Sequence, residues 1–154
     1  MPFNPFKLFS RPRVNNTKFW NPNFSGPILQ FTTKMSGSLH KVPKVDIDKS
    51  GVFKYILLKV YDQEVDGVEP STIVLRGYKR CNYHSDIYDE VQGKLIPFDC
   101  EPWGGGRISH DPDNKKIHIY GYSQAYGKAD HEEAAKLIKN AYPDYTITIS
   151  DEGY

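Results

Sequence analysis

The first 45 residues of this chain differ chemically from the rest, and this division limits where a folded domain can lie. Residues 1–45 hold seven Lys and Arg residues, no Asp or Glu, and six of the chain's eleven prolines. Proline at that density prevents a long helix or a central strand, because it lacks an amide proton and fixes φ. We therefore predict a basic, proline-rich, flexible extension over residues 1–44 and one compact domain over residues 45–154.

The extension bears on the location and partners of the protein. An acid-free basic leader is typical of mitochondrial targeting peptides, whereas its prolines disfavour the amphipathic helix that such peptides form. Its basic residues are scattered, which disfavours a nucleic-acid-binding arm. No apolar run approaches the roughly 20 residues of a membrane-spanning helix. The two cysteines, Cys81 and Cys100, suggest no disulfide framework. We therefore expect a cytoplasmic protein, with a mitochondrial one as the alternative.

Hydrophobic periodicity over residues 45–154 predicts an α+β domain. Residues 86–95 carry apolar side chains at helical spacing, with acids in the first turn. Residues 129–141 form the clearest amphipathic helix, in which Leu137, Ile138 and Ala141 are expected to face inward. Two helices among strands joined mostly by hairpins indicate this fold class. The predicted strands cover residues 52–61, 72–78, 107–110, 116–122 and 145–149, and a predicted turn covers residues 46–51.

Three consecutive glycines, Gly104–Gly106, interrupt the pattern before the predicted hairpin. Glycine lets backbone amides approach a ligand closely, so the triplet is a candidate phosphate cradle. The Lys-Ser/Thr pair that follows the last glycine of a P-loop is missing here. We therefore expect a tight loop at the entry to a strand.

The main candidate for chemistry is His84, which lies just before the predicted helix of residues 86–95. Amides at the N-terminus of a helix bind anions such as phosphate. The positive end of the helix dipole disfavours an imidazolium, so His84 is expected to stay neutral and to act as a base near pH 7. The structural alternative is a histidine that only caps or packs at the helix start.

Three further groups of residues are candidate sites. Cys100 lies seven residues before Arg107, one residue too far for the Cys-x5-Arg loop of cysteine-based phosphatases, so no thiolate nucleophile is expected. His110 and His118 flank the predicted hairpin turn without an evident third metal ligand, and we expect them on the surface. The loop Gly121–Gly127 presents small residues and a hydroxyl, which suits the second half of an anion pocket.

The domain also carries short blocks in which Gly, Tyr, Asp and His are interleaved. Each block alone is weak, but the set and its order are specific. The blocks are Val45–Asp48, Gly51–Tyr55, Arg76–Lys79, Tyr83–Asp89, Gly104–His110, Lys116–Ser123, Ala125–Gly127, Tyr142–Tyr145 and Asp151–Tyr154.

Over about residues 45–154 these blocks resemble the phosphohistidine phosphatase/janus family. The resemblance implies a single compact α/β sandwich, in which a mixed six-stranded sheet lies between two helices. The family's catalytic histidine corresponds to His84, and its substrate-contacting lysine corresponds to Lys54.

The same resemblance implies the remaining phosphate-binding residues. The family's phosphate loop corresponds to Ser123, Gln124 and Ala125. Basic residues matching Arg76 and Arg107 lie on strands near the family's site. The amide of Ser85, at the start of the helix, is expected to bind a phosphoryl oxygen as well.

The implied activity is a metal-independent hydrolase that removes phosphate from phosphohistidine, and also from phospholysine, in proteins. His84 would serve as general base or as nucleophile, and sequence does not separate these roles. No cofactor, nucleic acid or membrane is expected, and a monomer is the plain expectation. The alternative is a non-catalytic, janus-like regulatory or phospho-binding protein linked to sex differentiation.

Overall fold

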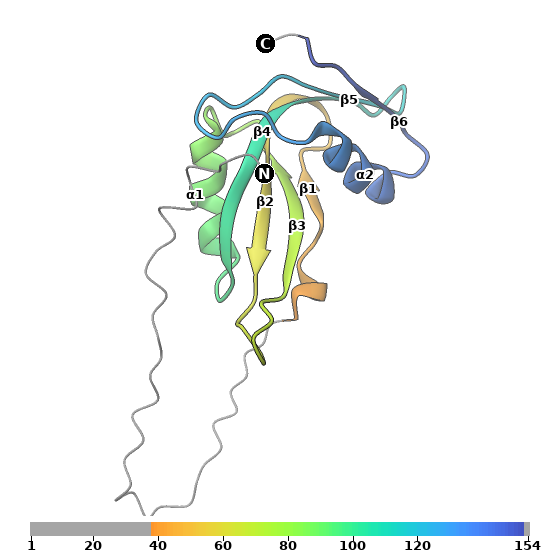
Figure 1. Cartoon of the computed structure of the whole chain (residues 1–154). Helices are drawn as coiled ribbons and strands as arrows, with labels where there is room; N and C mark the ends of the chain where they lie inside the picture. Colours follow the sequence, from red (N-terminus) through yellow and green to blue (C-terminus); the bar gives the residue numbers. More distant parts are fainter. Residues whose placement is uncertain (1–37, 153–154) are drawn as a thin grey trace, which may run out of the picture. The chain divides into compact units, whose positions relative to one another are not determined.

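A computed structural model describes residues 38–152 of the chain (Figure 1). No helix in this range is long and apolar enough to cross a membrane. The elements are a 3-10 helix, η2 (Leu39–Lys41), the strands β1 (Val45–Ile47), β2 (Gly51–Tyr61), β3 (Ser71–Gly77), β4 (Asp99–Asp111), β5 (Lys116–Tyr120) and β6 (Thr146–Ile149), and the helices α1 (His84–Lys94) and α2 (His131–Ala141).

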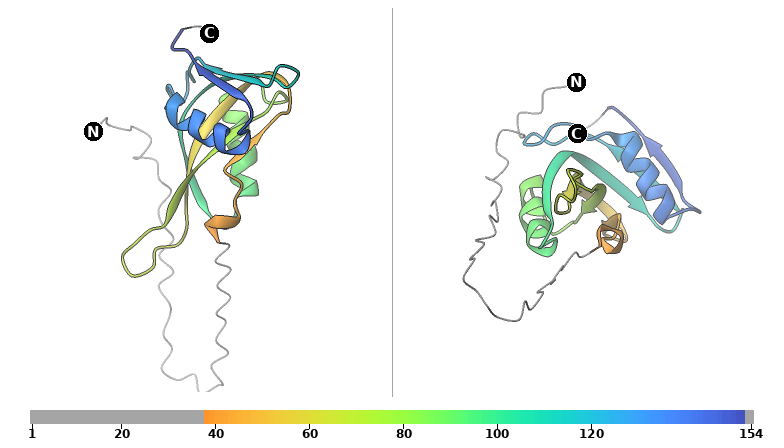
Figure 2. Two further views of the ribbon diagram at one scale, coloured as in Figure 1. Left: turned by 90° about the vertical axis from the view of Figure 1, so that its right-hand side faces the viewer. Right: turned by 60° about the horizontal axis from the view of Figure 1, so that its bottom comes forward.

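The six strands form one mixed sheet in the order β1-β3-β2-β4-β5-β6. The two outer pairs, β1 with β3 and β5 with β6, are parallel, and the inner pairs are antiparallel. The two helices lie on opposite faces of the curled sheet (Figure 1, Figure 2). This arrangement confirms the predicted α+β fold of one mixed six-stranded sheet and two helices.

Each face of the sheet has its own hydrophobic core. The central strand β2 contributes to both, because its successive side chains point to opposite faces. Its residues Ile56 and Leu58 join the core under α1, and Tyr55 and Leu57 join the core under α2. The core under α1 also contains Val60, Val74, Tyr78, Cys81, Ile87, Val91 and Leu95, and the core under α2 also contains Ile47, Phe53, Leu75, Ile108, Ile117, Ile119, Ala129, Ala134 and Ile138.

Both helices begin with a buried histidine that belongs to their apolar stripe. In α1 the buried residues are His84, Ile87 and Val91. In α2 they are His131, Ala134 and Ile138. The shared spacing of three and then four residues puts each histidine on the face that packs against the sheet.

Separate capping contacts fix the start of each helix. The Tyr83 amide donates to Asp86 Oδ2 at 2.9 Å at the start of α1. Asp130 Oδ1 accepts from the amides of Glu132 and Glu133 at 3.0 and 3.1 Å at the start of α2. These bonds satisfy first-turn amides that have no acceptor inside the helix.

Several predicted boundaries were wrong by a few residues. Asp46 and Ile47, assigned to a turn, belong to β1, which is too short to show alternation in sequence. The helices begin at His84 and His131 rather than at residues 86 and 129. Ala141, predicted to face inward, is exposed, because the buried face of α2 consists of His131, Ala134 and Ile138.

The glycine triplet was also misassigned. Gly104–Gly106 lie inside the 13-residue strand β4 rather than in a loop before it. Gly105 and Gly106 pair with Ile56 and Tyr55 of β2, so the ladder continues through them. The reason for glycine here is the close approach of other parts of the chain, which single-strand patterns do not reveal.

The segment before β1 is part of the described structure from residue 38 onward. Leu39 and Val42 pack against the core under α1, although the sequence placed them in the extension. The remainder of the predicted extension, residues 1–37, lies outside the described residues.

Candidate active site

His84 is the first residue of α1, and its ring lies against the middle of β4. It is 7% exposed, and its Nε2 lies 2.9 Å from the carbonyl oxygen of Gly106. A carbonyl oxygen only accepts hydrogen bonds, so Nε2 carries the proton of the neutral ring. The lone pair is therefore on Nδ1, to which no protein group within residues 38–152 forms a hydrogen bond.

The surroundings of His84 favour this neutral form. Burial lowers the pKa of His84 below its ordinary value of 6.5, and the positive charges of Lys54 and Arg107 lower it further. The hydrogen bond to the Gly106 carbonyl opposes these effects in part. The predicted neutral ring is thus supported, and burial is the largest cause of the lowered pKa.

Two glycines of β4 make room for two histidine rings, those of His84 and His131. A Cβ atom on Gly105 would lie 2.7 Å from His84 Cδ2 and 2.7 Å from the carbonyl oxygen of Tyr55. A Cβ atom on Gly106 would lie 2.8 Å from Cε1 of His131 on the other face. Gly105 and Gly106 therefore let a histidine pack against each face of the same strand.

Lys54 and Arg107 place positive charge beside the ring. They are direct partners in the antiparallel ladder between β2 and β4, so their side chains project on the same face. Like charges in such a pair repel one another, and an anion between them would offset the repulsion. Both act on the pKa of His84, which places them within electrostatic reach of its imidazole.

The loop that follows β5 is closed by its own hydrogen bonds. The amides of Ser123 and Gly127 each donate to the other's carbonyl, at 3.1 and 2.8 Å. Ser123 is only 1% exposed, and its Oγ accepts from the amide of Tyr126 at 3.1 Å. Among residues 38–152, this hydroxyl donates its proton to no protein acceptor. In the described part of the chain, the amides of Gln124 and Ala125, both exposed, donate to no protein acceptor.

Two contacts bring this loop next to the start of α1. Gly105, the glycine on which a Cβ atom would overlap the His84 ring, donates its amide proton to the Gly127 carbonyl at 3.0 Å. The ring of Tyr126 packs edge-on against Tyr88 of α1, with centroids 5.9 Å apart. The N-terminus of α1, with the amide of Ser85, and the loop thus meet at the same part of β4.

Arg76 is placed differently from the other predicted residues. It is 5% exposed, and its guanidinium donates to the carbonyl oxygens of Leu75 and Pro43 at 2.9 and 2.8 Å. It lines a separate cavity of about 170 Å³ together with Tyr78 and Lys94, near the end of α1 rather than its start. The contacts of Arg76 are those of a buried structural cation, and burial lowers its pKa.

Sequence reasoning missed the pair His131 and Tyr55 beneath the site. His131 Nε2 lies 2.9 Å from the Gly121 carbonyl, so Nδ1 accepts from the Tyr55 hydroxyl at 2.5 Å. Burial raises the pKa of Tyr55 and so keeps its proton in place. This pair holds Gly121, the residue that opens the loop after β5. The Asp130-His131 start of α2, which parallels Tyr83-His84, was the signal available in the sequence.

The prediction for His110 was wrong, because this side chain is buried rather than on the surface. Its Nδ1 donates to the Asp48 carbonyl at 2.9 Å, and its ring packs edge-on against Tyr142 and Tyr145. His118 is half-buried and contacts the hydroxyl of Thr148 at 2.7 Å. Across residues 38–152, no group of three or more His, Cys, Asp or Glu side chains could hold a metal ion.

Comparison with known proteins now adds to this geometry. The sequence model of the Janus/Ocnus family (Ocnus) matches residues 39–146. The chain is 48% identical over 130 residues to the sex-regulated protein janus-A of Drosophila pseudoobscura pseudoobscura, covering 82% of this chain and 87% of the relative. It is 50% identical over 117 residues to the human 14 kDa phosphohistidine phosphatase, covering 73% and 94%, and 48% identical over 123 residues to the pig protein of that name, covering 77% and 98%. The chain therefore belongs to the Janus/Ocnus family.

Proposed function

We propose that this protein is a phosphohistidine phosphatase, which hydrolyses the P–N bond of phosphohistidine in protein substrates and also accepts phospholysine. The observation that carries the proposal is the neutral ring of His84, which lies near two cations and whose Nδ1 accepts no hydrogen bond from residues 38–152. Support also comes from the relatives named phosphohistidine phosphatase.

The phosphoryl group would be bound by charge and by backbone amides, without a metal. Lys54 and Arg107 supply positive charge on the sheet side. The amide of Ser85 at the helix start and that of Ala125 in the loop supply donors, and the Ser123 hydroxyl supplies another. Such fixed donors stabilise the charge that builds up on a transferring phosphoryl group.

His84 can act by either of two routes that use the same nitrogen. As a general base, Nδ1 takes a proton from water while the water oxygen attacks phosphorus and the P–N bond of the substrate breaks. As a nucleophile, Nδ1 forms its own P–N bond, which water then hydrolyses. In both routes the leaving imidazole of the substrate takes up a proton.

The test is phosphate release from a phosphohistidine peptide in the presence of EDTA. Wild type is expected to release phosphate, and His84→Ala to lose about 10²–10⁴-fold in rate if His84 is a general base, or more if it is the nucleophile. His118→Ala is the matched control, since this histidine is half-buried on β5 and contacts Thr148 of β6. Near wild-type turnover by His84→Ala would refute the assignment.

A non-catalytic role is the second candidate, because the chain is equally similar to janus-A proteins. In that case the same pocket would bind a phosphorylated partner without turnover, in a regulatory role linked to sex differentiation. Binding of the phosphopeptide by wild type without phosphate release would favour this candidate.

We further infer a monomer that acts in the cytoplasm on proteins, without nucleic acid or membrane. Within residues 38–152, Cys81 and Cys100 form no disulfide, which supports a reducing compartment. A mitochondrial location through residues 1–44 is the alternative, which imaging of the full chain and of a chain lacking this segment would separate.

A further inference from the structure

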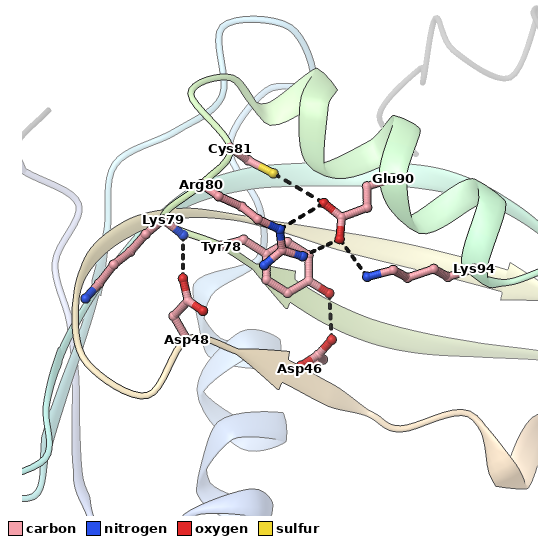
Figure 3. A network of polar contacts seen from close by, with 8 residues as sticks. All are labelled: Asp46, Asp48, Tyr78, Lys79, Arg80, Cys81, Glu90 and Lys94. Carbon is pink, nitrogen blue, oxygen red and sulfur yellow. Dashed lines mark hydrogen bonds and ion pairs between the residues drawn. The ribbon is translucent and has the colours of Figure 1, made fainter.

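The connection between β3 and α1, residues 78–83, delivers His84 to its place, and its first half is tied to the β1 segment (Figure 3). The hydroxyl of Tyr78 donates to Asp46 Oδ2 at 2.6 Å. The amide of Lys79 donates to Asp48 Oδ2, also at 2.6 Å. The connection therefore leaves the sheet from a fixed point.

The second half of the connection is tied to α1 by Glu90. Arg80 donates to this carboxylate through Nε, 3.2 Å from Oε2, and through Nη2 to Oε1. The thiol of Cys81 lies 3.8 Å from Oε2. Hydrogen bonds from Arg80 and from Lys94 lower the pKa of Glu90 to about 2, so the carboxylate is ionised wherever the protein is folded at ordinary pH.

Arg80 joins the two sets of contacts, because it binds Glu90 and also packs against Tyr78. Its guanidinium lies 4.1 Å from the ring centroid of the buried Tyr78. A paired and stacked guanidinium is more strongly confined than an isolated surface ion pair. Figure 3 shows the path of contacts from Asp46 through Tyr78 and Arg80 to Glu90. Only Asn82 and Tyr83 separate this tied segment from His84.

We propose that Glu90 is a positioning residue for His84. It fixes the start of α1 relative to β4 by holding Arg80, and so maintains the bond from His84 Nε2 to the Gly106 carbonyl. When this bond is lost, the ring turns and the proton is no longer confined to Nε2, so the Nδ1 lone pair is lost part of the time. The inference rests on the proposed catalytic role of His84.

The structure provides a matched control on the same carboxylate. Lys94 Nζ binds Glu90 Oε1 at 2.6 Å, but both residues lie within α1, one turn apart. The Nζ of Lys94 also lies 5.7 Å from the ring centroid of Tyr78. Lys94→Ala nevertheless leaves the bonds from Tyr78 to Asp46 and from Arg80 to Glu90 in place, so it removes a partner of Glu90 while the connection stays tied at both ends. Arg80→Ala and Glu90→Ala each remove the contact between the connection and α1. The double variant Arg80→Ala/Glu90→Ala removes the same contact, so its effect should be no larger than that of either single variant.

The experiment measures turnover and the state of His84 in these variants. Arg80→Ala and Glu90→Ala are expected to lower kcat by about threefold to tenfold with KM little changed, less than the roughly 10²-fold of a 1 Å misplacement. The acid limb of the pH–rate profile is expected to move up towards pH 6.5, because a looser ring is better solvated. Lys94→Ala is expected to change neither kcat nor the acid limb. The double variant Arg80→Ala/Glu90→Ala is expected to have the same kcat and the same acid limb as each single variant.

A second measurement is independent of activity. The ¹⁵N shifts of the His84 ring identify the protonated nitrogen, which is expected to be Nε2 in wild type and Lys94→Ala and mixed in Glu90→Ala. If Glu90→Ala lowers thermal stability but leaves both kcat and the tautomer unchanged, the positioning role is refuted.

The two proposals fail in different ways. Absence of turnover in wild type together with a Glu90-dependent tautomer would refute the phosphatase and support the positioning. If the alanine variants do not fold, Arg80→Lys keeps the charge but not the two-pronged contact, and it is expected to reproduce the shift of the acid limb in milder form. A wild-type profile and tautomer in Arg80→Lys would refute the positioning.

Discussion

At the scale of single residues, the chemistry depends on which nitrogen of His84 carries the proton. One backbone acceptor, the Gly106 carbonyl, decides this, and burial with the charges of Lys54 and Arg107 keeps the ring neutral. The two cations thus have a double effect, because they attract a phosphoryl group and also disfavour an imidazolium. Since the pKa lies below 6.5, the acid limb of activity is expected below pH 6.5.

Lys54→Met is expected to raise the pKa of His84, because a positive charge that disfavours its protonation is removed. The shift is measurable by NMR titration of the free protein, which separates this effect from loss of substrate binding. Lys59→Met is the control. Lys59 is on the same strand, but it lies on the other face, over the rings of Tyr61 and Trp103. An unchanged His84 pKa in Lys54→Met would contradict the electrostatic explanation.

At the scale of elements, the glycines of β4 let the first residue of each helix lie close to the sheet. Gly105→Ala is expected to destabilise the protein by about 1–3 kcal/mol, because its Cβ would overlap the His84 ring and the backbone of Tyr55. It is also expected to lower turnover by about tenfold or more, since the ring must move. Denaturant unfolding and phosphate release measure the two effects.

Gly93→Ala provides the matched control for this prediction. Gly93 lies in α1, and a Cβ atom there meets nothing within 4 Å. The substitution is expected to stabilise the protein by about 0.5–1 kcal/mol through helix propensity, with no change in turnover. Equal effects of the two substitutions would contradict the role assigned to Gly105.

Local patterns predicted those elements whose signal is local. The strands of residues 52–61 and 72–78 and the helix of residues 86–95 were found because periodicity and turn residues mark them. Gly104–Gly106 were missed as part of a strand because glycine is depleted in strands. Gly105 and Gly106 face His84 and His131, and Gly104 has a positive φ and lies against the backbone of Ala129, so the reason for glycine comes from residues far away along the chain.

The candidate site was predictable in part for the same reason. The position of His84 at a helix start follows from its neighbours in sequence, and the loop of residues 123–125 followed from resemblance. The tautomer of His84, the partnership of His131 with Tyr55, and the placement of Arg76 near the end of α1 depend on contacts between distant segments. Sequence patterns do not contain that information.

At the scale of the whole domain, the two faces of the sheet are built alike. On each face a helix starts with a buried histidine whose Nε2 donates to a backbone carbonyl, that of Gly106 on one face and that of Gly121 on the other. Burial lowers the pKa of both histidines below 6.5. Protonation of either one therefore favours the unfolded chain, in which an imidazolium is solvated.

The stability of the domain is accordingly expected to fall in mild acid. A group whose pKa is depressed by folding contributes stability above its unfolded pKa and loses that contribution as the pH falls towards its folded value. The melting temperature should therefore drop between about pH 7.5 and pH 5.5, a range in which ordinary carboxylates remain ionised. Scanning calorimetry at several pH values measures this.

The double variant His84→Gln/His131→Gln tests the assignment to these two residues. Its melting temperature is expected to be lower at pH 7.5 but nearly constant down to about pH 5.5, because neither glutamine titrates. Inorganic phosphate is expected to raise the melting temperature of wild type, since a ligand that binds only the native state stabilises it by mass action. A double variant that keeps the full pH dependence would place the titrating groups elsewhere in the domain, and the symmetric roles of the two histidines would then be wrong.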